Sequence, residues 1–120
     1  MFSYNKKLKE GKLYVSISSA IQYNFKFLDE VTKLMSEVEN SKCDKIYFFS
    51  EEDNIHFDKL GSAYLFNTLI FFSKNKCVLV DKSLYKIFHD QVSHYDGAKF
   101  ERIDLVEVSK SKIQQCYTIS

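Results

Sequence analysis

Short apolar runs alternate with helix-length amphipathic segments along this chain, and that order restricts its fold more than any other feature. Two of the runs, "KIYFF" (45–49) and "CVLV" (77–80), are continuously apolar, as is typical of strands covered on both faces. Strands that are separated by helices run parallel in one sheet, because the crossover returns the chain to the same edge. The sequence therefore predicts an α/β fold built on a mostly parallel sheet.

The two ends of the chain add further strands. Residues 2–18 contain two β-prone runs around a polar turn that ends at Gly11, a residue that tolerates positive φ, so we expect a hairpin. Alternating polarity across 99–108 predicts a last strand, whereas the tail at 109–120 fits either a short helix or an edge strand. The expected order is ββ-α-β-α-β-α-β, an N-terminal β-hairpin followed by alternating helices and strands in a mixed sheet.

Three helices are expected between these strands. The first, "NFKFLDEVTKLMSEVEN", carries an apolar stripe at helical spacing and begins at its expected N-cap, Asn24. The second, "GSAYLFNTLIFFSKN", follows Asp58, whose carboxylate we expect to accept backbone N–H bonds from the first turn. The third, "SLYKIFHDQVSHY", has Ser83 as its expected cap.

The composition fits one globular domain that spans residues 1–120. Hydrophobic residues make up 45% of the chain and charged residues 28%, which argues against disorder. The formal charge of +1 creates no field that would favour nucleic acid or an anionic membrane as the main partner.

The cysteines and the hydropathy pattern predict a cytoplasmic protein. Cys43, Cys77 and Cys116 form no CxxC or Cys/His spacing, so we expect neither a zinc site nor a disulfide framework, and free thiols fit a reducing cytosol. The first residues lack the apolar core of a signal peptide. The most apolar segment, 63–72, is too short to cross a bilayer.

No set of residues in the sequence forms a recognisable catalytic centre. His56, His89 and His94 lie in different settings, and the chain has no Gly-x-Ser-x-Gly elbow and no glycine-rich phosphate loop. We therefore expect no catalytic residue, no cofactor and no metal site. One alternative stays open, a metal-binding or enzymatic site on the acidic loop "EEDNIHFD" (51–58), because oxygen-rich loops bind hard cations.

The stretch "KIYFF…HFDKLGSAYL" resembles the STAS domain family, named for sulfate transporters and anti-sigma-factor antagonists. The characteristic segment of that family is a strand, a short loop that ends in an apolar residue and aspartate, and then Ser/Thr-x-Gly at a helix start. Phe57, Asp58 and Gly61 stand at the apolar, aspartate and glycine positions. The resemblance covers nearly the whole chain and implies a STAS-like fold.

One position departs from the family pattern. Lys59 follows the aspartate, where the switchable members carry the Ser or Thr that becomes phosphorylated. The phospho-switch therefore does not carry over to this position, and Lys59 places a positive charge where those members gain a dianion. Ser62, one residue past the glycine, is kept as a candidate phosphorylation site.

By resemblance, the chain is a non-catalytic regulatory module that docks a partner protein at this helix start. The implied partner is an ATP-binding anti-sigma kinase, as in partner switching, or the ATPase of a transporter, for which some STAS proteins serve as accessory subunits. The residues expected to form the docking surface are Asp58, Lys59, Gly61, Ser62, Tyr64, Leu65 and Phe66.

The helix after Gly61 leaves two interpretations open, because it is apolar almost all round. It is either a core helix flanked by the other two helices, or an exposed apolar patch that binds a partner or a second copy of the chain. The second interpretation includes a structural homodimer joined by this helix.

Overall fold

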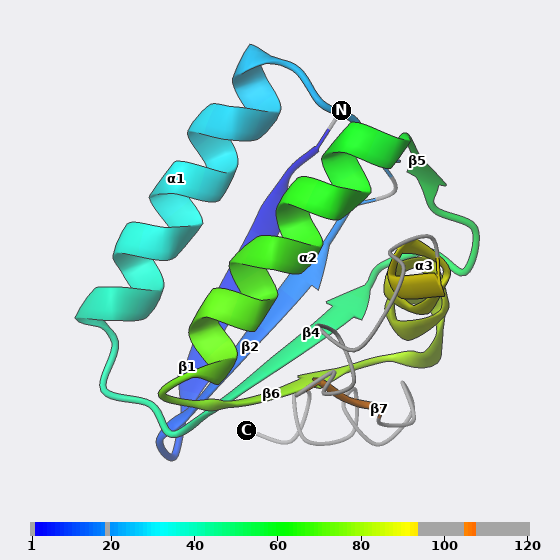
Figure 1. Ribbon diagram of the computed structural model, residues 1–120. Helices are drawn as coiled ribbons and strands as arrows, with labels where there is room; N and C mark the ends of the chain where they lie inside the picture. Colours follow the sequence, from blue (N-terminus) through cyan, green and yellow to red (C-terminus); the bar gives the residue numbers. More distant parts are fainter. Residues whose placement is uncertain (1, 19, 94–104, 108–120) are drawn as a thin grey trace.

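A five-stranded mixed sheet forms one layer of the protein in the computed structural model, which describes residues 2–18, 20–93 and 105–107 (Figure 1). The strand order is β1-β2-β4-β6-β7, in which β1 pairs antiparallel with β2 and the other three pairings are parallel. The mixed α/β sheet expected from the sequence is therefore confirmed. Its strands are β1 (Tyr4–Lys9), β2 (Lys12–Ile17), β4 (Lys45–Ser50), β6 (Cys77–Val80) and β7 (Leu105–Glu107).

Three helices pack on one face of the sheet, and their buried side chains join the inward residues of β2, β4 and β6 in a single apolar cluster. The middle helix, α2, contacts α1 on one side and α3 on the other (Figure 1). The helices are α1 (Phe25–Asn40), α2 (Lys59–Ser73) and α3 (Lys82–Ser93). The ends expected for the third helix at 94–95, most of the last strand at 99–108, and the tail at 109–120 lie outside the described residues.

Two of the three expected helix caps are confirmed, and one is wrong. The side-chain oxygen of Asn24 accepts a hydrogen bond from the Phe27 N–H at 2.8 Å, and Asp58 caps α2. Ser83 does not cap α3, because that helix already begins at Lys82. Its cap is Asp81, whose Oδ1 accepts a bond from the N–H of Leu84 at 2.9 Å.

The helix after Gly61 is a core helix, the first of the two interpretations. Its position between two other helices buries most of its apolar side chains, while Lys59, Leu60, Asn67 and Phe71 stay exposed. Leu65, Phe66, Leu69 and Phe72 are buried in the main cluster. The large apolar side chains that stay exposed lie at its two ends, Leu60 at the first turn and Phe71 at the last.

The opposite face of the sheet carries a small aromatic cluster. Tyr14 and Tyr47 are paired in register on β2 and β4, and their rings stack with centroids 4.9 Å apart. Phe49, two residues further along β4, is buried in the same cluster. Because Phe48 is buried on the helical face, β4 is covered on both sides, as its continuous apolar run predicted.

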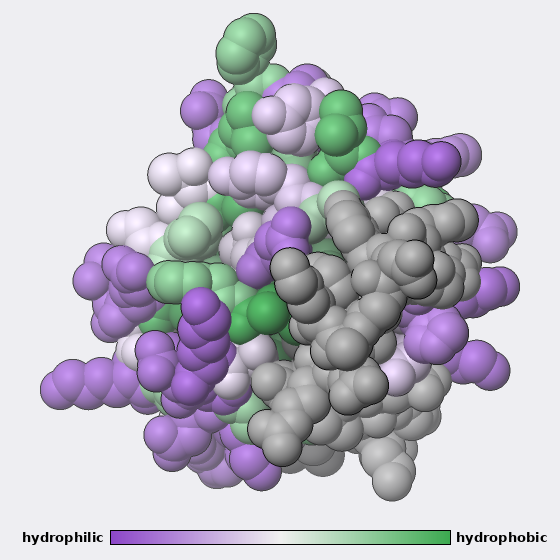
Figure 2. Space-filling view, viewed as in Figure 1, coloured by the Kyte–Doolittle hydropathy of each residue, from purple (hydrophilic) through white to green (hydrophobic). Residues whose placement is uncertain are grey.

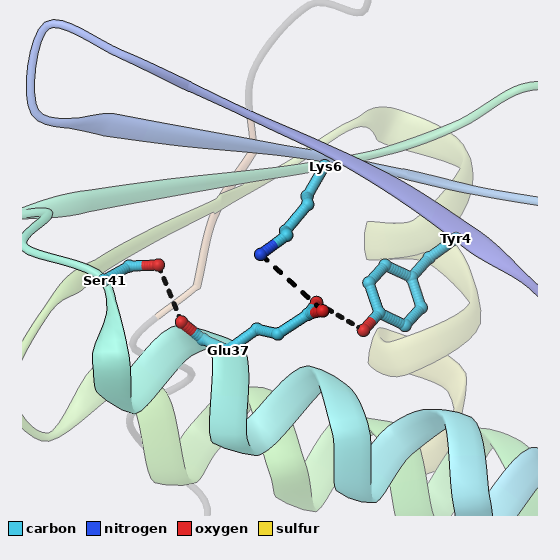
Figure 3. A network of polar contacts seen from close by, with 4 residues as sticks. All are labelled: Tyr4, Lys6, Glu37 and Ser41. Atoms are coloured by element: carbon cyan, nitrogen blue, oxygen red, sulfur yellow. Dashed lines mark hydrogen bonds and ion pairs between the residues drawn. The ribbon is translucent and has the colours of Figure 1, made fainter.

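The edge strand β1 is joined to α1 by a polar network (Figure 3). The hydroxyl of Tyr4 donates a hydrogen bond to Glu37 Oε2 at 2.5 Å, and the ammonium of Lys6 lies 3.6 Å from Glu37 Oε1. Burial of the phenol, together with the hydrogen bond and the negative charge of Glu37, raises the pKa of Tyr4 well above its usual range. This network holds the first helix against the edge of the sheet.

A second, two-stranded sheet was not expected from the sequence. β3 (Ala20–Ile21) pairs parallel with β5 (His56–Phe57), so the chain that leaves β2 runs beside the chain that leads into α2. Strands of two residues are too short to show any periodicity, which is why the pattern did not reveal them. This pairing brings the entries to α1 and α2 together.

Candidate functional site

Asp58 links the entries to α1 and α2 through three hydrogen bonds. Its Oδ1 accepts a bond from the N–H of Gly61 at 2.6 Å, which caps α2. Its Oδ2 accepts a bond from the N–H of Tyr23 at 3.0 Å, and its own N–H donates to the carbonyl oxygen of Ile21 at 3.1 Å. One carboxylate therefore satisfies donors from two separate segments and fixes them relative to each other.

Gly61 is required at this point because the backbone of β3 comes too close for a side chain. A Cβ at this position would lie 2.7 Å from the carbonyl oxygen of Ile21 and 2.8 Å from Asp58 Oδ1. Both distances are shorter than a carbon–oxygen contact allows, and the first involves backbone that cannot rotate away. The aspartate and glycine of the sequence motif thus serve one purpose, the close docking of α2 onto the chain before α1.

Ser62 is fully buried behind this helix start. Its hydroxyl donates a hydrogen bond to the Asp58 carbonyl at 2.8 Å and also lies 3.2 Å from the Lys59 carbonyl. A kinase would reach this hydroxyl only if the first turn of α2 opened. Phosphorylation of Ser62 stays a prediction, and it would require the first turn of α2 to open.

The seven residues expected on the docking surface fall into two groups. Asp58 and Lys59 are exposed, and Tyr64 is half-buried with its ring 6.2 Å from the ring of Tyr23. The others are buried: Gly61 and Ser62 at the helix start, and Leu65 and Phe66 in the core. These four contribute to a surface only by holding the exposed residues in place.

Four large apolar side chains that the motif did not single out as docking residues are exposed at the starts of α1 and α2. Phe25 is 88% exposed, Leu60 66%, Phe57 46% and Tyr23 45%. We call Tyr23, Phe25, Phe57 and Leu60 the apolar cap. Figure 2 shows green and pale side chains at the top of the molecule, over the first turns of α1 and α2. The cap is assembled by tertiary structure, since Asp58 joins Tyr23 to residues more than 30 positions away.

One sequence signal could have pointed to the cap. Phe25 opens the first helix but lies outside the apolar stripe of Phe27, Val31, Leu34 and Val38 that the helix buries. A large aromatic side chain off the buried stripe of a helix has no core to enter. Leu60 gave no such signal, because every face of its helix is apolar.

A buried aspartate fixes the neighbouring end of the sheet. Asp81 follows β6 and is fully buried, and its Oδ2 accepts hydrogen bonds from the N–H of Ser50 at 2.8 Å and from the Ser50 hydroxyl at 3.0 Å. Its Oδ1 caps α3 through the N–H of Leu84. Asp81 therefore holds the carboxyl end of β4 against the start of α3, where the acidic loop leaves the sheet.

The residues of the acidic loop at 51–58 have different structural roles. Glu51 Oε1 accepts hydrogen bonds from the Asn5 amide and the Ser16 hydroxyl, each at 3.3 Å, so it faces the hairpin. His56 belongs to β5, and Asp58 caps α2. Among the residues that the structure describes, no three His, Cys, Asp or Glu side chains come together in a group that could hold a metal ion.

None of the described helices combines the length and the apolar character that a membrane-crossing helix needs. This holds for α2 as well, the most apolar of the three.

The sheet order, the three helices and the cap at the start of α2 define a small α/β domain with a STAS-like fold. Among solved structures, the chain is similar to the anti-sigma factor antagonist SpoIIAA in its unphosphorylated form, with a TM-score of 0.54 over 98% of this chain and 99% of that chain. The two sequences are 8% identical, so the likeness concerns the fold alone. No family model and no curated protein matches the sequence.

Proposed function

We propose that this chain is a non-catalytic regulatory module that binds another protein through the apolar cap and the adjoining Asp58, Lys59 and Tyr64. The observation that carries the proposal is the exposure of four large apolar side chains at the adjoining starts of α1 and α2. Large apolar and aromatic side chains gathered on a surface are typical of interaction sites, and aromatic residues dominate the energetics of interface centres.

The contacts of Tyr23 within this surface support the proposal. Asp58 fixes the chain beside Tyr23, and the ring of Tyr23 lies 6.2 Å from that of Tyr64 and 6.4 Å from that of the buried Phe27. A surface that is already ordered loses little conformational entropy when a partner binds. Tyr23 is therefore held in place before a partner binds.

The fold favours a particular class of partner. The structurally similar SpoIIAA is described as an anti-sigma factor antagonist, and the resemblance to STAS domains implies an ATP-binding kinase or a transporter ATPase as the partner here. Lys59 at the usual phosphorylation position fits the members that act without a phospho-switch. On this proposal the whole chain, residues 1–120, works as one domain and performs no catalysis itself.

The experiment is a binding measurement with a matched control. A partner captured with the tagged wild-type chain is identified by mass spectrometry, purified and titrated against the wild type, Leu60→Asp and Phe71→Asp. Both substitutions replace an exposed apolar residue of α2 with the same charge, but Phe71 lies at the other end of the helix. We expect Leu60→Asp to weaken binding about 30-fold or more, the effect of losing a hot spot, and Phe71→Asp to leave it unchanged.

Two results would contradict the proposal. If both variants lost affinity equally, either the interface would lie elsewhere on α2 or the loss would be a general effect of the added charge. The second result is a wild-type chain that is a dimer at micromolar concentration and a Leu60→Asp variant that is a monomer. In that case the cap would bind a second copy of the chain instead of a different protein.

A further inference from the structure

A cleft of about 470 Å³ opens beside the apolar cap, between the loop that leads into α2 and the first turns of α3. Its apolar lining comes from Ile55, Phe57 and Ile87. Phe57 also belongs to the apolar cap, so the cleft and the cap form one continuous surface. A cleft of this size lies within the range of natural ligand sites and could receive several residues of an extended segment.

One wall of the cleft carries two positive charges. Lys82 and Lys86 are four residues apart on α3, so they share a face of that helix, and both line the cleft. Among the side chains of residues 2–18 and 20–89, which the structure describes, no carboxylate forms an ion pair with Lys82 or Lys86, whereas Lys6 on β1 is paired with Glu37. The hydroxyl of Ser83 adds a further donor to the same wall.

The facing wall carries acceptors. Asp53 and Asn54 line it; Asp53 already takes part in another interaction, and the side-chain oxygens of the pair have several lone pairs for N–H donors. Phosphate could bind the lysines, but it has no N–H groups to donate to these acceptors. An extended peptide matches both walls, because its backbone donates N–H groups to one while acidic side chains reach the lysines on the other.

We propose that this cleft binds an acidic, extended segment of the partner protein, with an apolar side chain of that segment seated against Ile55, Phe57 and Ile87. The inference rests on the proposed function, since the segment belongs to the protein that docks on the apolar cap. Two lysines on one wall steer and orient such a segment by charge complementarity, and the apolar lining holds it.

The test is a ¹H–¹⁵N NMR titration of the whole chain with three probes. The probes are the acidic hexapeptide Glu-Glu-Leu-Glu-Glu-Leu, its basic counterpart Lys-Lys-Leu-Lys-Lys-Leu, and inorganic phosphate, each to about 2 mM, where weak peptide binding is detectable. We expect the acidic peptide alone to shift the amides of 53–57 and 82–87. The variant Lys82→Glu/Lys86→Glu should bind it about tenfold more weakly, the effect of reversing two exposed charges.

A charge-matched variant guards against a general effect of net charge. Lys33→Glu/Lys42→Glu changes the net charge by the same amount at two exposed lysines outside the cleft, and it should bind the acidic peptide as the wild type does. Equal binding of the basic peptide, or equal shifts with phosphate, would overturn the proposal, as would the absence of shifts at the cleft with the acidic peptide.

The same variants separate this inference from the proposed function. If Leu60→Asp abolishes binding of the purified partner while Lys82→Glu/Lys86→Glu leaves it unchanged, the cap is the docking site and the cleft proposal fails. If the lysine variant weakens the partner about tenfold at low salt and much less at high salt, the cleft holds an acidic segment of that partner.

Discussion

At the scale of single residues, Gly61 sets how closely α2 can approach the chain before α1. We expect Gly61→Ala to destabilise the protein by about 1–3 kcal/mol, the usual effect of overpacking, because the new Cβ would lie 2.7 Å from the Ile21 carbonyl oxygen. Helix propensity alone predicts the opposite sign, a gain of about 1 kcal/mol. Urea unfolding decides between them, and a variant as stable as the wild type would contradict the close contact.

Tyr4 gives the protein a pH-dependent contribution to stability at the alkaline end. Its folded-state pKa is raised by burial and by Glu37, so the folded state holds the phenolic proton more tightly than the unfolded state, whose pKa is about 10. The contribution is therefore fully present below pH about 10 and is lost as the pH rises above it.

The measurement is the free energy of unfolding of the wild type and Tyr4→Phe between pH 8 and pH 11, a range set by the usual tyrosine pKa of about 10. The wild type should lose stability more steeply than Tyr4→Phe in the upper part of that range. Parallel curves would show that the folded state does not hold the Tyr4 proton more tightly than the unfolded state. The comparison with Tyr4→Phe removes the contributions of the other tyrosines.

At the scale of elements, the turn of the β1–β2 hairpin consists of two residues with positive φ, Glu10 at 53° and Gly11 at 75°. A two-residue turn of this kind matches the twist of the strands, but a glutamate in the left-handed region is strained. We expect Glu10→Asn to raise the free energy of unfolding by about 0.5–1 kcal/mol, since asparagine tolerates this region. A control on the half-buried Lys7 of β1, Lys7→Asn, should not stabilise the protein, because asparagine is disfavoured in strands.

At the scale of the whole molecule, two apolar residues of α2 should behave in opposite ways. Phe66 is buried against Phe88, with ring centroids 5.6 Å apart, whereas Leu60 is 66% exposed. Phe66→Asp should prevent folding, because an unpaired charge in the core costs more than about 4 kcal/mol. Leu60→Asp should keep its melting temperature within a few degrees of the wild type, as circular dichroism would show.

This comparison also shows which residues can test for a homodimer joined by α2. Loss of a dimer in Phe66→Asp would report unfolding and not the loss of an interface, because the side chain is in the core. Phe71 and Leu60 are the large apolar residues of the same helix that are exposed. A dimer that survives both Leu60→Asp and Phe71→Asp would have its interface outside α2.

The sequence by itself determined the class of fold, the opening hairpin, and the caps at Asn24 and Asp58. Apolar periodicity reports which residues face a core, and capping chemistry acts within three or four residues, so both can be read from the chain. The third cap was misplaced at Ser83, because Asp81 is selected by its contacts with Ser50 on β4, a neighbour in space only.

Only the tertiary structure decided which apolar residues form a surface. Pairing of β3 with β5 and the bond from Tyr23 to Asp58 bring Tyr23 and Phe25 beside Phe57 and Leu60. The same packing buries Leu65 and Phe66, which the helical sequence alone did not distinguish from exposed residues. Burial depends on what packs against an element, and for α2 this is set by α1 and α3, whose placement no local pattern encodes.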